Sequence, residues 1–499
     1  MREKLVLERA REEGWALAFN DVRLRPAHSE IMPDEVNLET MFSRNVGLKI
    51  PIVSAAMDTV TESRLAIQLA KLGGLGVIHR GLTIEKQASE VAKVKHSLHG
   101  LIENPICAKA DDTVLSLLNS RNEKGYSFHS FPVIDDDGKL VGIVTQTDVL
   151  FCRDYNQKLG EIMTSNLFTA SKGITMDDAY EVMMKNRVKV LPLVDENGKI
   201  SGMYAAVDLR RIMDGSAVNY NLDDKGQLRV GAAVGVGNEA LKRVKRLYEK
   251  GIDVIVIDTA HGDSKGVIDT LKRIKNRYPK LDVVVGNVSI GDSAKRLADE
   301  GADGIKIGQG PGSICTTRII AGVGRPQLAA VYDCARVLEG YNIPLCADGG
   351  ITYSGDITIA IAAGADSVMI GSLLAGTDET PVEIVLAQGR QWKSYRGMGS
   401  LGAMKQHKSS RQRYLQEGRR EKDLIPEGVE GLAPYRGKLE GVIKYLVGGL
   451  KQGMGYIGVK DISELRENTE FDRVTNAGIN ESHPHDVNIT EEAPNYRGR

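Results

Sequence analysis

The chain has 499 residues, of which 42% are hydrophobic and 26% are charged, and its formal net charge is −1 at pH 7. This length exceeds one ordinary hydrophobic core, so two or three globular domains are expected. The near-neutral charge gives no electrostatic reason to expect a nucleic-acid or membrane partner. No run of about 20 apolar residues could span a bilayer, and the charged N-terminal stretch lacks the apolar core of a signal peptide.

Cysteine usage favours a reducing compartment. The five cysteines are odd in number and lack metal-ligand spacing: Cys107, Cys152, Cys315, Cys334 and Cys346. We therefore expect no disulfide framework and a cytoplasmic location.

Short runs rich in Val and Ile recur along the chain and predict buried parallel strands. They lie near residues 50, 75, 230, 253, 282, 304, 343 and 367, and most precede a segment with apolar residues three and four apart. The segments that begin at Asn238 and Gly291 stop at glycines, as crossover helices do. Eight strands that alternate with helices predict an α/β fold, the (β/α)8 TIM barrel.

About 150 residues separate the second and third predicted strands, which is too many for a loop. Two similar units lie in this gap, beginning at Phe131 and Leu191. Each predicts a strand, an acidic turn closed by Gly, a second strand, and a helix that starts at Asp148 or Asp208. We therefore predict a first barrel part over residues 1–103, an inserted tandem domain over 104–215, and a second barrel part over 216–499.

The stretch from Gly235 to Ala240 fits the G-x-G-x-x-A fingerprint of a dinucleotide-binding fold, with Asp258 about 20 residues further on. That fingerprint opens a doubly wound sheet, whereas this strand lies in a run of similar β/α units. We interpret its glycines as strand-end residues of a barrel.

Polar residues follow several predicted strands, at the end where barrel enzymes carry their catalytic groups. They include Ser54, Asp258, Asn287 and Cys315. After the seventh and eighth strands, "ADGGI" and "IGS" expose backbone NH groups and the Ser372 hydroxyl, which suits a phosphate. Asp348 would then accept hydrogen bonds from sugar hydroxyls. Tight turns and a structural cap are the alternatives.

Cys315 lies in the glycine-rich stretch "GQGPGSICTTR", whose backbone amides and hydroxyls can stabilise a thiolate. A lone cysteine more often packs as a small hydrophobe, as expected for Cys334 and Cys346. A base for Cys315 would have to come from elsewhere in the fold. The charged segment from Met404 to Gly428 has no hydrophobic face, and it is either a solvated loop or a mobile lid.

Six motifs together resemble one known family in order and spacing: "SAAMDTVTES", "DTAHGDS", "GPGSICTTR", "ADGGI", "IGS" and "YRGMGSLGAM". That family comprises inosine-5'-monophosphate (IMP) dehydrogenases and GMP reductases, and the resemblance extends from about Asn20 to the last residues. The inserted repeats look like the pair of cystathionine-β-synthase (CBS) modules that such enzymes carry.

The resemblance implies a two-step reaction. The thiolate of Cys315 attacks the purine carbon at position 2 of IMP, and hydride passes to NAD⁺. The resulting thioimidate is hydrolysed to xanthosine monophosphate (XMP), a step committed to guanine nucleotides. In the mobile flap, at about residues 400–430, Arg413 serves as general base with Tyr414, and Thr317 lies beside the reacting base. Arg411 is an alternative that does not precede a tyrosine.

The same resemblance implies the binding residues. The nucleotide's ribose and phosphate are assigned to Ser313, Asp348, Gly349, Gly350, Gly371, Ser372 and Tyr395. The purine site is assigned to Ser54, Met57, Arg396, Gly397, Met398, Gly399 and Glu427. NAD is assigned to Asp258, Gly308, Gln309 and Gly310.

The family also binds K⁺ through backbone carbonyls. Here these are implied to belong to Gly310, Gly312 and Cys315, with Glu481, Ser482 and His483 supplied by a neighbouring subunit. That arrangement implies a homotetramer.

Three positions depart from the family pattern. Gln309 replaces an apolar residue in the G-x-G turn, which affects expectations for cofactor or inhibitor contacts. In the repeats, Thr147 replaces a basic residue and Ala205 replaces a hydroxyl residue. Purine nucleotides are expected at the CBS pair because each repeat supplies an aspartate of the ribose-binding type, and Ala205 leaves one of the two sites in doubt.

Two other functions remain open on the sequence. A GMP reductase would share the barrel and cysteine loop but would run a reductive deamination with NADPH, and the Arg413–Tyr414 pair argues against it. A nucleotide-sensing scaffold with an inactive barrel would have no need of Cys315, Arg413 and Tyr414 together.

Overall fold

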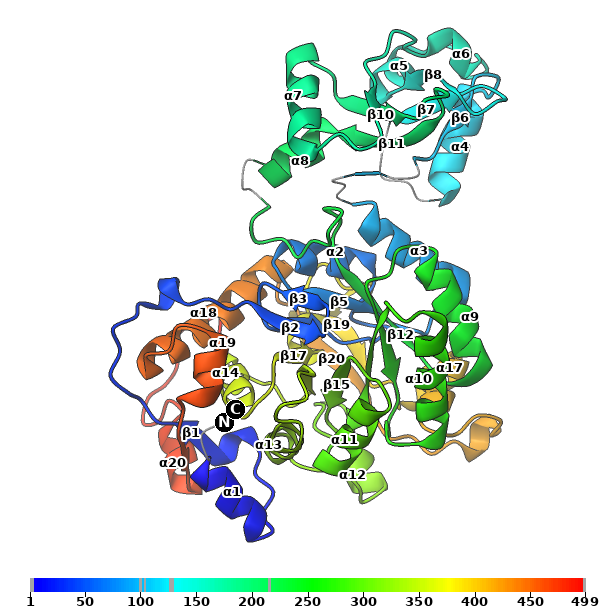
Figure 1. Ribbon diagram of the computed structural model, residues 1–499. Helices are drawn as coiled ribbons and strands as arrows, with labels where there is room; N and C mark the ends of the chain where they lie inside the picture. Colours follow the sequence, from blue (N-terminus) through cyan, green and yellow to red (C-terminus); the bar gives the residue numbers. More distant parts are fainter. Residues whose placement is uncertain (1–3, 98–100, 103–104, 125–129, 214–216, 497–499) are drawn as a thin grey trace. The chain divides into compact units, whose positions relative to one another are not determined.

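The computed structural model describes residues 4–97, 101–102, 105–124, 130–213 and 217–496 (Figure 1). The chain divides into two compact units, one formed by Met1–Ala92 with Arg229–Arg499 and the other by Lys93–Leu228. The second unit contains the predicted insertion at 104–215.

The first unit is built around a closed barrel of eight parallel strands. In barrel order the strands are β12 (Val230–Val234), β13 (Val254–Asp258), β14 (Asp282–Val288), β15 (Gly304–Ile307), β16 (Leu345–Asp348), β17 (Ser367–Ile370), β4 (Ile52–Ser54) and β5 (Leu75–Ile78). β5 pairs with β12 across the sequence gap, and β17 pairs with β4. The predicted TIM barrel is confirmed.

Helices surround the barrel strands (Figure 1). They are α2 (Ser63–Lys71), α3 (Ile84–Lys95), α9 (Gly237–Tyr248), α10 (Lys265–Arg277), α11 (Gly291–Asp299), α13 (Gln327–Val337) and α14 (Ser354–Ala362). α9 shows why the sequence folds this way, because it buries Ala240, Val244 and Leu247 on one face and leaves Lys242, Lys245 and Arg246 exposed. The strands are buried on both faces, which explains their unbroken runs of Val and Ile. The G-x-G-x-x-A stretch belongs to this barrel and opens no doubly wound sheet.

Smaller elements complete the first unit. At one end a hairpin of β2 (Thr40–Ser43) and β3 (Val46–Leu48) buries Phe42 against the barrel core. An antiparallel sheet joins β18 (Ile384–Ala387), β19 (Arg390–Arg396) and β20 (Glu430–Pro434). The remaining elements are α1 (Leu5–Glu12), β1 (Val22–Leu24), α12 (Thr317–Ile320), α15 (Ser372–Ala375), α18 (Leu439–Ile457), α19 (Ile462–Glu467), β21 (Phe471–Arg473) and α20 (Asn476–Glu481).

The charged segment between β19 and β20 is folded into short elements. It contains α16 (Leu401–Gln406), α17 (Lys408–Arg413) and η3 (Glu421–Asp423). Ser410 and Gln416 are buried within it. Ala403 and Met404 of α16 are also fully buried, so the local order of the segment comes from both apolar burial and polar contacts.

The second unit contains two matching three-stranded sheets. One is formed by β6 (Ala108–Lys109), β7 (Phe131–Ile134) and β8 (Leu140–Val144), and the other by β9 (Ala170–Ser171), β10 (Val190–Val194) and β11 (Ile200–Ala205). In both sheets the first pair is parallel and the second antiparallel. The helices of this unit are α4 (Val114–Lys124), α5 (Gln146–Phe151), α6 (Leu159–Ile162), α7 (Met176–Asn186) and α8 (Ala206–Met213).

The turns of the two repeats use the same chemistry. The backbone NH of Lys139 donates to the Asp135 carboxylate, and that of Lys199 donates to the Asp195 carboxylate, both at 2.8 Å. The helices that follow β8 and β11 begin at Gln146 and Ala206, two residues before the predicted starts at Asp148 and Asp208. This difference arises because each aspartate occupies the third helical position, and Asp148 accepts the Thr145 NH from there at 2.7 Å.

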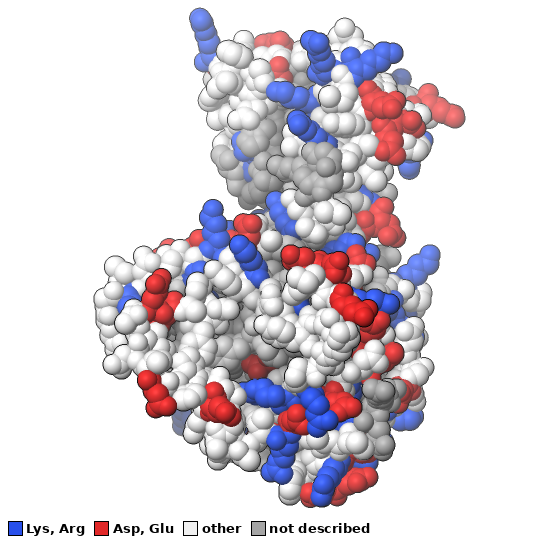
Figure 2. All heavy atoms as spheres, turned by 90° about the vertical axis from the view of Figure 1, so that its left-hand side faces the viewer, with Lys and Arg blue, Asp and Glu red and all other residues white. Residues whose placement is uncertain are grey.

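Basic and acidic side chains are interspersed over the face shown in Figure 2. This agrees with the net charge of −1. None of the helices in the described part of the chain combines the length and hydropathy that crossing a bilayer requires.

Candidate active site

A cavity of about 160 Å³ opens at the carboxyl ends of the barrel strands. Residues from six of the eight barrel strands or the loops that follow them line it, together with the β19–β20 segment. Among the predicted site residues, its lining includes Met57, Asp258, Gly308, Gln309, Gly310, Gly312, Cys315, Thr317, Asp348, Gly349, Tyr395, Gly397, Met398, Arg413, Tyr414 and Glu427. Residues far apart in the sequence thus meet at one place.

Cys315 lies in the loop that follows β15. Its thiol is free and partly exposed, and Sγ donates to Thr317 Oγ1 at 3.2 Å. The loop is held by backbone bonds, since Cys315 NH donates to Gly312 O at 3.0 Å and Thr316 NH donates to Glu427 O at 3.0 Å. Burial raises the pKa of Cys346 to about 12 and that of Cys334 further, so these two thiols stay protonated in the core.

A buried ionic cluster forms the floor of the cavity. Lys306, only 1% exposed, pairs with Asp258 at 2.9 Å and also contacts the Asp348 carboxylate and Asn287 Oδ1. Asn287 Nδ2 donates to Asp348 Oδ2 at 2.9 Å. The sequence analysis missed Lys306. Its signal is a lysine inside the apolar run "GIKIG", because a lysine there needs buried acidic partners.

The flap places Arg413 and Tyr414 against this cluster. Arg413 Nη1 forms an ion pair with Asp258, and the Arg413 carbonyl accepts the Ala260 NH at 3.2 Å. Burial raises the pKa of Tyr414, whose ring lies where a β-carbon on Gly399 would stand. Both flap residues therefore share the cavity with Cys315. Arg411 instead donates to Met404 O at 2.7 Å within the flap.

All of the residues predicted for ribose and phosphate except Gly371 line this cavity or an adjoining one. The second cavity is lined by Ser313, Gly350, Ser372 and Tyr395 among others, and it shares Pro311, Ile314 and Tyr395 with the first. Gly349 and Gly350 adopt φ values of 90° and 85°, which favour glycine. A β-carbon on Gly371 would lie 2.9 Å from the Tyr395 hydroxyl, so this glycine leaves room for the ring.

Three of the residues predicted for the purine lie outside the cavity lining: Ser54, Arg396 and Gly399, the last of which packs against the Tyr414 ring. Ser54 is fully buried and accepts a hydrogen bond from Thr61 Oγ1 at 2.8 Å. Arg396 Nε donates to Asp58 at 3.0 Å. The contacts with Thr61 and Asp58 hold the side chains of Ser54 and Arg396 outside the cavity lining, so these two residues support the site rather than line it.

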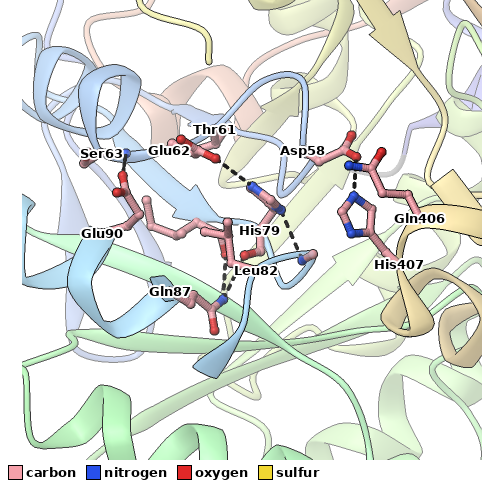
Figure 3. A network of polar contacts seen from close by, with 12 residues as sticks. Asp58, Thr61, Glu62, Ser63, His79, Leu82, Gln87, Glu90, Gln406 and His407 are labelled. Atoms are coloured by element: carbon pink, nitrogen blue, oxygen red, sulfur yellow. Dashed lines mark hydrogen bonds and ion pairs between the residues drawn. The ribbon is translucent and has the colours of Figure 1, made fainter. Parts of the chain in front are cut away.

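Asp58 links the flap to the barrel (Figure 3). It pairs with Arg396 and, at 2.9 Å, with His407, whose ring Figure 3 shows directed at the carboxylate. Burial alone would raise the pKa of Asp58, but the hydrogen bonds from His407 and Arg396 outweigh it and lower the pKa to about 2. Neither Asp58 nor His407 was singled out from the sequence.

The cofactor residues fit a nucleotide that offers hydroxyl groups. Asp258 Oδ1 is buried at the cavity and accepts no hydrogen bond, although it lies in the ion pair with Lys306. Gln309 bridges two loops, since Oε1 accepts from Ser289 and Nε2 donates to Ala260 O at 3.3 Å. A carboxylate and a fixed amide at the cavity wall are groups suited to a ribose.

The predicted K⁺ residues lie in two parts of the first unit. Gly310, Gly312 and Cys315 share the loop after β15, and Glu481, Ser482 and His483 stand at the end of α20. His483 Nδ1 is 2.9 Å from the Tyr496 hydroxyl. Within the described residues no cluster of three His, Cys, Asp or Glu side chains could hold a metal. Backbone carbonyls in the glycine-rich loop are suited to a monovalent cation.

The fold is a TIM barrel, and its site combines a partly exposed thiol, a buried carboxylate–lysine cluster and glycine turns after the seventh and eighth strands. This combination is typical of the class of barrel enzymes that act on nucleotides. The family model for the IMP dehydrogenase / GMP reductase domain matches residues 16–485. The chain therefore belongs to the IMP dehydrogenase / GMP reductase family.

Individual relatives cover almost the whole chain. It is 52% identical to an inosine-5'-monophosphate dehydrogenase of Aquifex aeolicus over 98% of this chain and 99% of the relative. The Bacillus subtilis relative of the same name is 48% identical over 96% and 97% of the two chains. A solved structure of a Trypanosoma brucei GMP reductase variant, in complex with guanosine 5'-monophosphate, superposes with a TM-score of 0.86 at 38% identity, covering 95% of this chain and 98% of that one.

Proposed function

We propose that this chain oxidises IMP to XMP with NAD⁺ as the hydride acceptor. The observation that carries the proposal is that Cys315, Asp258, Arg413 and Tyr414 line one cavity. The identity of 52% over nearly the full length to a relative named inosine-5'-monophosphate dehydrogenase supports the substrate.

In the first step the Cys315 thiolate adds to carbon 2 of IMP. When bound, NAD⁺ accepts the hydride that leaves this carbon, and a covalent thioimidate on Cys315 remains. Thr317, 3.2 Å from the thiol, holds Sγ toward the reacting carbon. Gly350 and Ser372 bind the phosphate end through a backbone NH and a hydroxyl, beside Gly349, whose NH donates to Met369 O at 3.3 Å.

In the second step water adds to the same carbon and the carbon–sulfur bond breaks. The ion pair with Asp258 holds the charged form of Arg413 at the cavity, so Arg413 must leave Asp258 and lose its proton to solvent before it acts as the base. Neutral Arg413 then takes a proton from the water, XMP leaves, and the Cys315 thiol is restored. Tyr414 excludes bulk water from the cavity. The balanced reaction is IMP, NAD⁺ and water to XMP, NADH and a proton.

We further propose that K⁺ binds at the backbone carbonyls of Gly310, Gly312 and Cys315. The protein would be a homotetramer, in which residues 481–483 of a neighbouring subunit complete this site. We also propose that the second unit is a CBS pair. The paired sheets and the shared Asp135 and Asp195 turns support a tandem pair.

The decisive experiment supplies IMP and NAD⁺ in the presence of K⁺ and follows NADH absorbance and XMP. We expect both products in equal amounts, and a lower rate when K⁺ is replaced by a larger organic cation. Because the solved GMP reductase shares the fold, GMP with NADPH is the parallel reaction. NADPH oxidation with GMP and no reaction with IMP would overturn the proposal.

A further inference from the structure

The flap helix α17 is fastened to the barrel outside the cavity. Arg80 follows β5 and is only 6% exposed, and its Nη1 donates to Gln412 Oε1 at 2.7 Å. Gln412 Nε2 in turn donates to Val236 O, after β12, at 3.4 Å. Gln412 directly precedes Arg413, so one side chain ties the end of α17 to two barrel loops.

Gly235 leaves the space that this contact occupies. A β-carbon there would lie 2.1 Å from Arg80 Nη1 and 2.3 Å from Gln412 Oε1. Gly235 is not among the glycines with a left-handed backbone, so its conformation does not itself require glycine. The first glycine of the G-x-G-x-x-A stretch therefore serves the Arg80–Gln412 hydrogen bond.

The docking contact brings two guanidinium groups together. Burial, followed by the charge of Arg413, lowers the pKa of Arg80 to about 9. Glu239 and Glu417 oppose this effect, whereas Arg243 adds to it. Arg80 Nη2 is buried without a hydrogen-bond partner. The hydrogen bond to Gln412 must therefore offset the electrostatic cost of placing α17 here.

We propose that Arg80, Gly235 and Gln412 form a docking contact that positions Arg413 for hydrolysis of the Cys315 adduct. None of the three lines the cavity, so they are positioning residues rather than catalytic residues. The inference rests on the proposed function, because it concerns the hydrolytic step. It predicts a defect confined to the second half of the reaction.

The test compares Gly235→Ala and Gln412→Leu with wild type by rapid mixing of IMP and NAD⁺. We expect the first burst of NADH to form at nearly the wild-type rate and steady-state turnover to fall about 10- to 100-fold, the cost of misplacing a catalytic group. Mass spectrometry of acid-quenched enzyme should show the Cys315 adduct accumulating. Gln412→Glu keeps the acceptor for Arg80 and should restore much of the turnover.

Gly266→Ala is the matched control, because nothing lies within 4 Å of a β-carbon at this α10 glycine. If the burst and the steady state slowed equally in the Gly235 and Gln412 variants, or if neither changed, the docking contact would be overturned. The proposed function would still stand, because wild type would still form NADH from IMP. Failure of wild type to form NADH from IMP would overturn both.

Discussion

At the scale of single residues, Cys315 is the group on which the proposed chemistry depends. Cys315→Ala removes the sulfur that attacks IMP but little of the binding surface, so we expect turnover to vanish while IMP binding persists. NADH absorbance measures the first effect, and calorimetric titration with IMP measures the second. Cys152→Ala, in the other unit, is the matched control and should keep wild-type turnover. Persistent NADH production by the Cys315 variant would rule out the nucleophile.

Asp58 gives a second prediction at this scale, concerning pH. Its pKa is about 2 in the fold against an ordinary value of 3.8, so its ion pairs with Arg396 and His407 stabilise the protein above pH 4. That stabilisation, about 2 kcal/mol, is lost as the pH falls from 4 toward 2. We expect Asp58→Asn to lower the melting temperature at pH 7, and the difference from wild type to shrink as the pH approaches 3.

Calorimetric melting of both proteins between pH 7 and pH 3 checks this expectation. Asp111→Asn is the control, because the Asp111–Lys158 pair is exposed and screened by water. A difference between wild type and Asp58→Asn that stayed constant with pH would show that the Asp58 ion pairs do not stabilise the fold.

Side-chain roles were harder to predict than positions along the chain. Cys315 and Asp258 could be placed at strand ends because buried apolar runs mark where each strand stops. A lysine inside an apolar run marks Lys306 as unusual, but its two carboxylate partners come from other strands, so no local pattern could predict them. The direction of Arg396 was also hidden, since it depends on Asp58, some 340 residues earlier in the chain.

At the scale of elements, the packing of α18 on α14 depends on one glycine of an adjacent pair. A β-carbon on Gly449 would stand 2.4 Å from Ser354 Cβ, whereas one on Gly448 would meet nothing within 4 Å. Gly449→Ala should therefore push the helices apart and destabilise the fold by about 1–3 kcal/mol. Gly448→Ala should stabilise it by about 0.5–1 kcal/mol through helix propensity.

Urea denaturation of the two variants measures these opposite signs. The pair is matched, because both changes add one methyl group to neighbouring positions of the same helix. Similar stability of the two variants would contradict the close approach of α14 and α18.

The barrel strands were predictable as elements, and the flap helices were not. A strand buried on both faces is apolar along most of its length, so an unbroken apolar run in the sequence predicts it. α16 buries only Ala403 and Met404, and α17 is held by polar contacts such as Arg80 to Gln412, so neither helix leaves a periodic signal in a charged segment.

At the scale of the whole molecule, the second unit interrupts the barrel between α3 and β12. The first unit nevertheless closes its barrel alone, because β5 pairs with β12 from Val230↔Gly76 to Ala232↔Ile78. An insertion of more than 100 residues could be predicted from a break in strand spacing. Its edges could not be fixed from the repeats, because Lys95 and Asp223, which pair at 2.8 Å, lie outside both of them.

We expect a variant in which a short glycine–serine linker replaces residues 93–228 to fold and to keep its steady-state rate within a few-fold of wild type. The barrel strands, the cavity and the flap all belong to the first unit, so the deletion removes no cavity residue. Circular dichroism and NADH production from IMP and NAD⁺ measure folding and rate.

Calorimetry with ATP, ADP and GTP should give heat with the full chain and none with the variant. If no nucleotide gave heat with the full chain, the second unit would not bind purine nucleotides. A deletion variant that folded but had no activity would show that the barrel needs the insertion for catalysis.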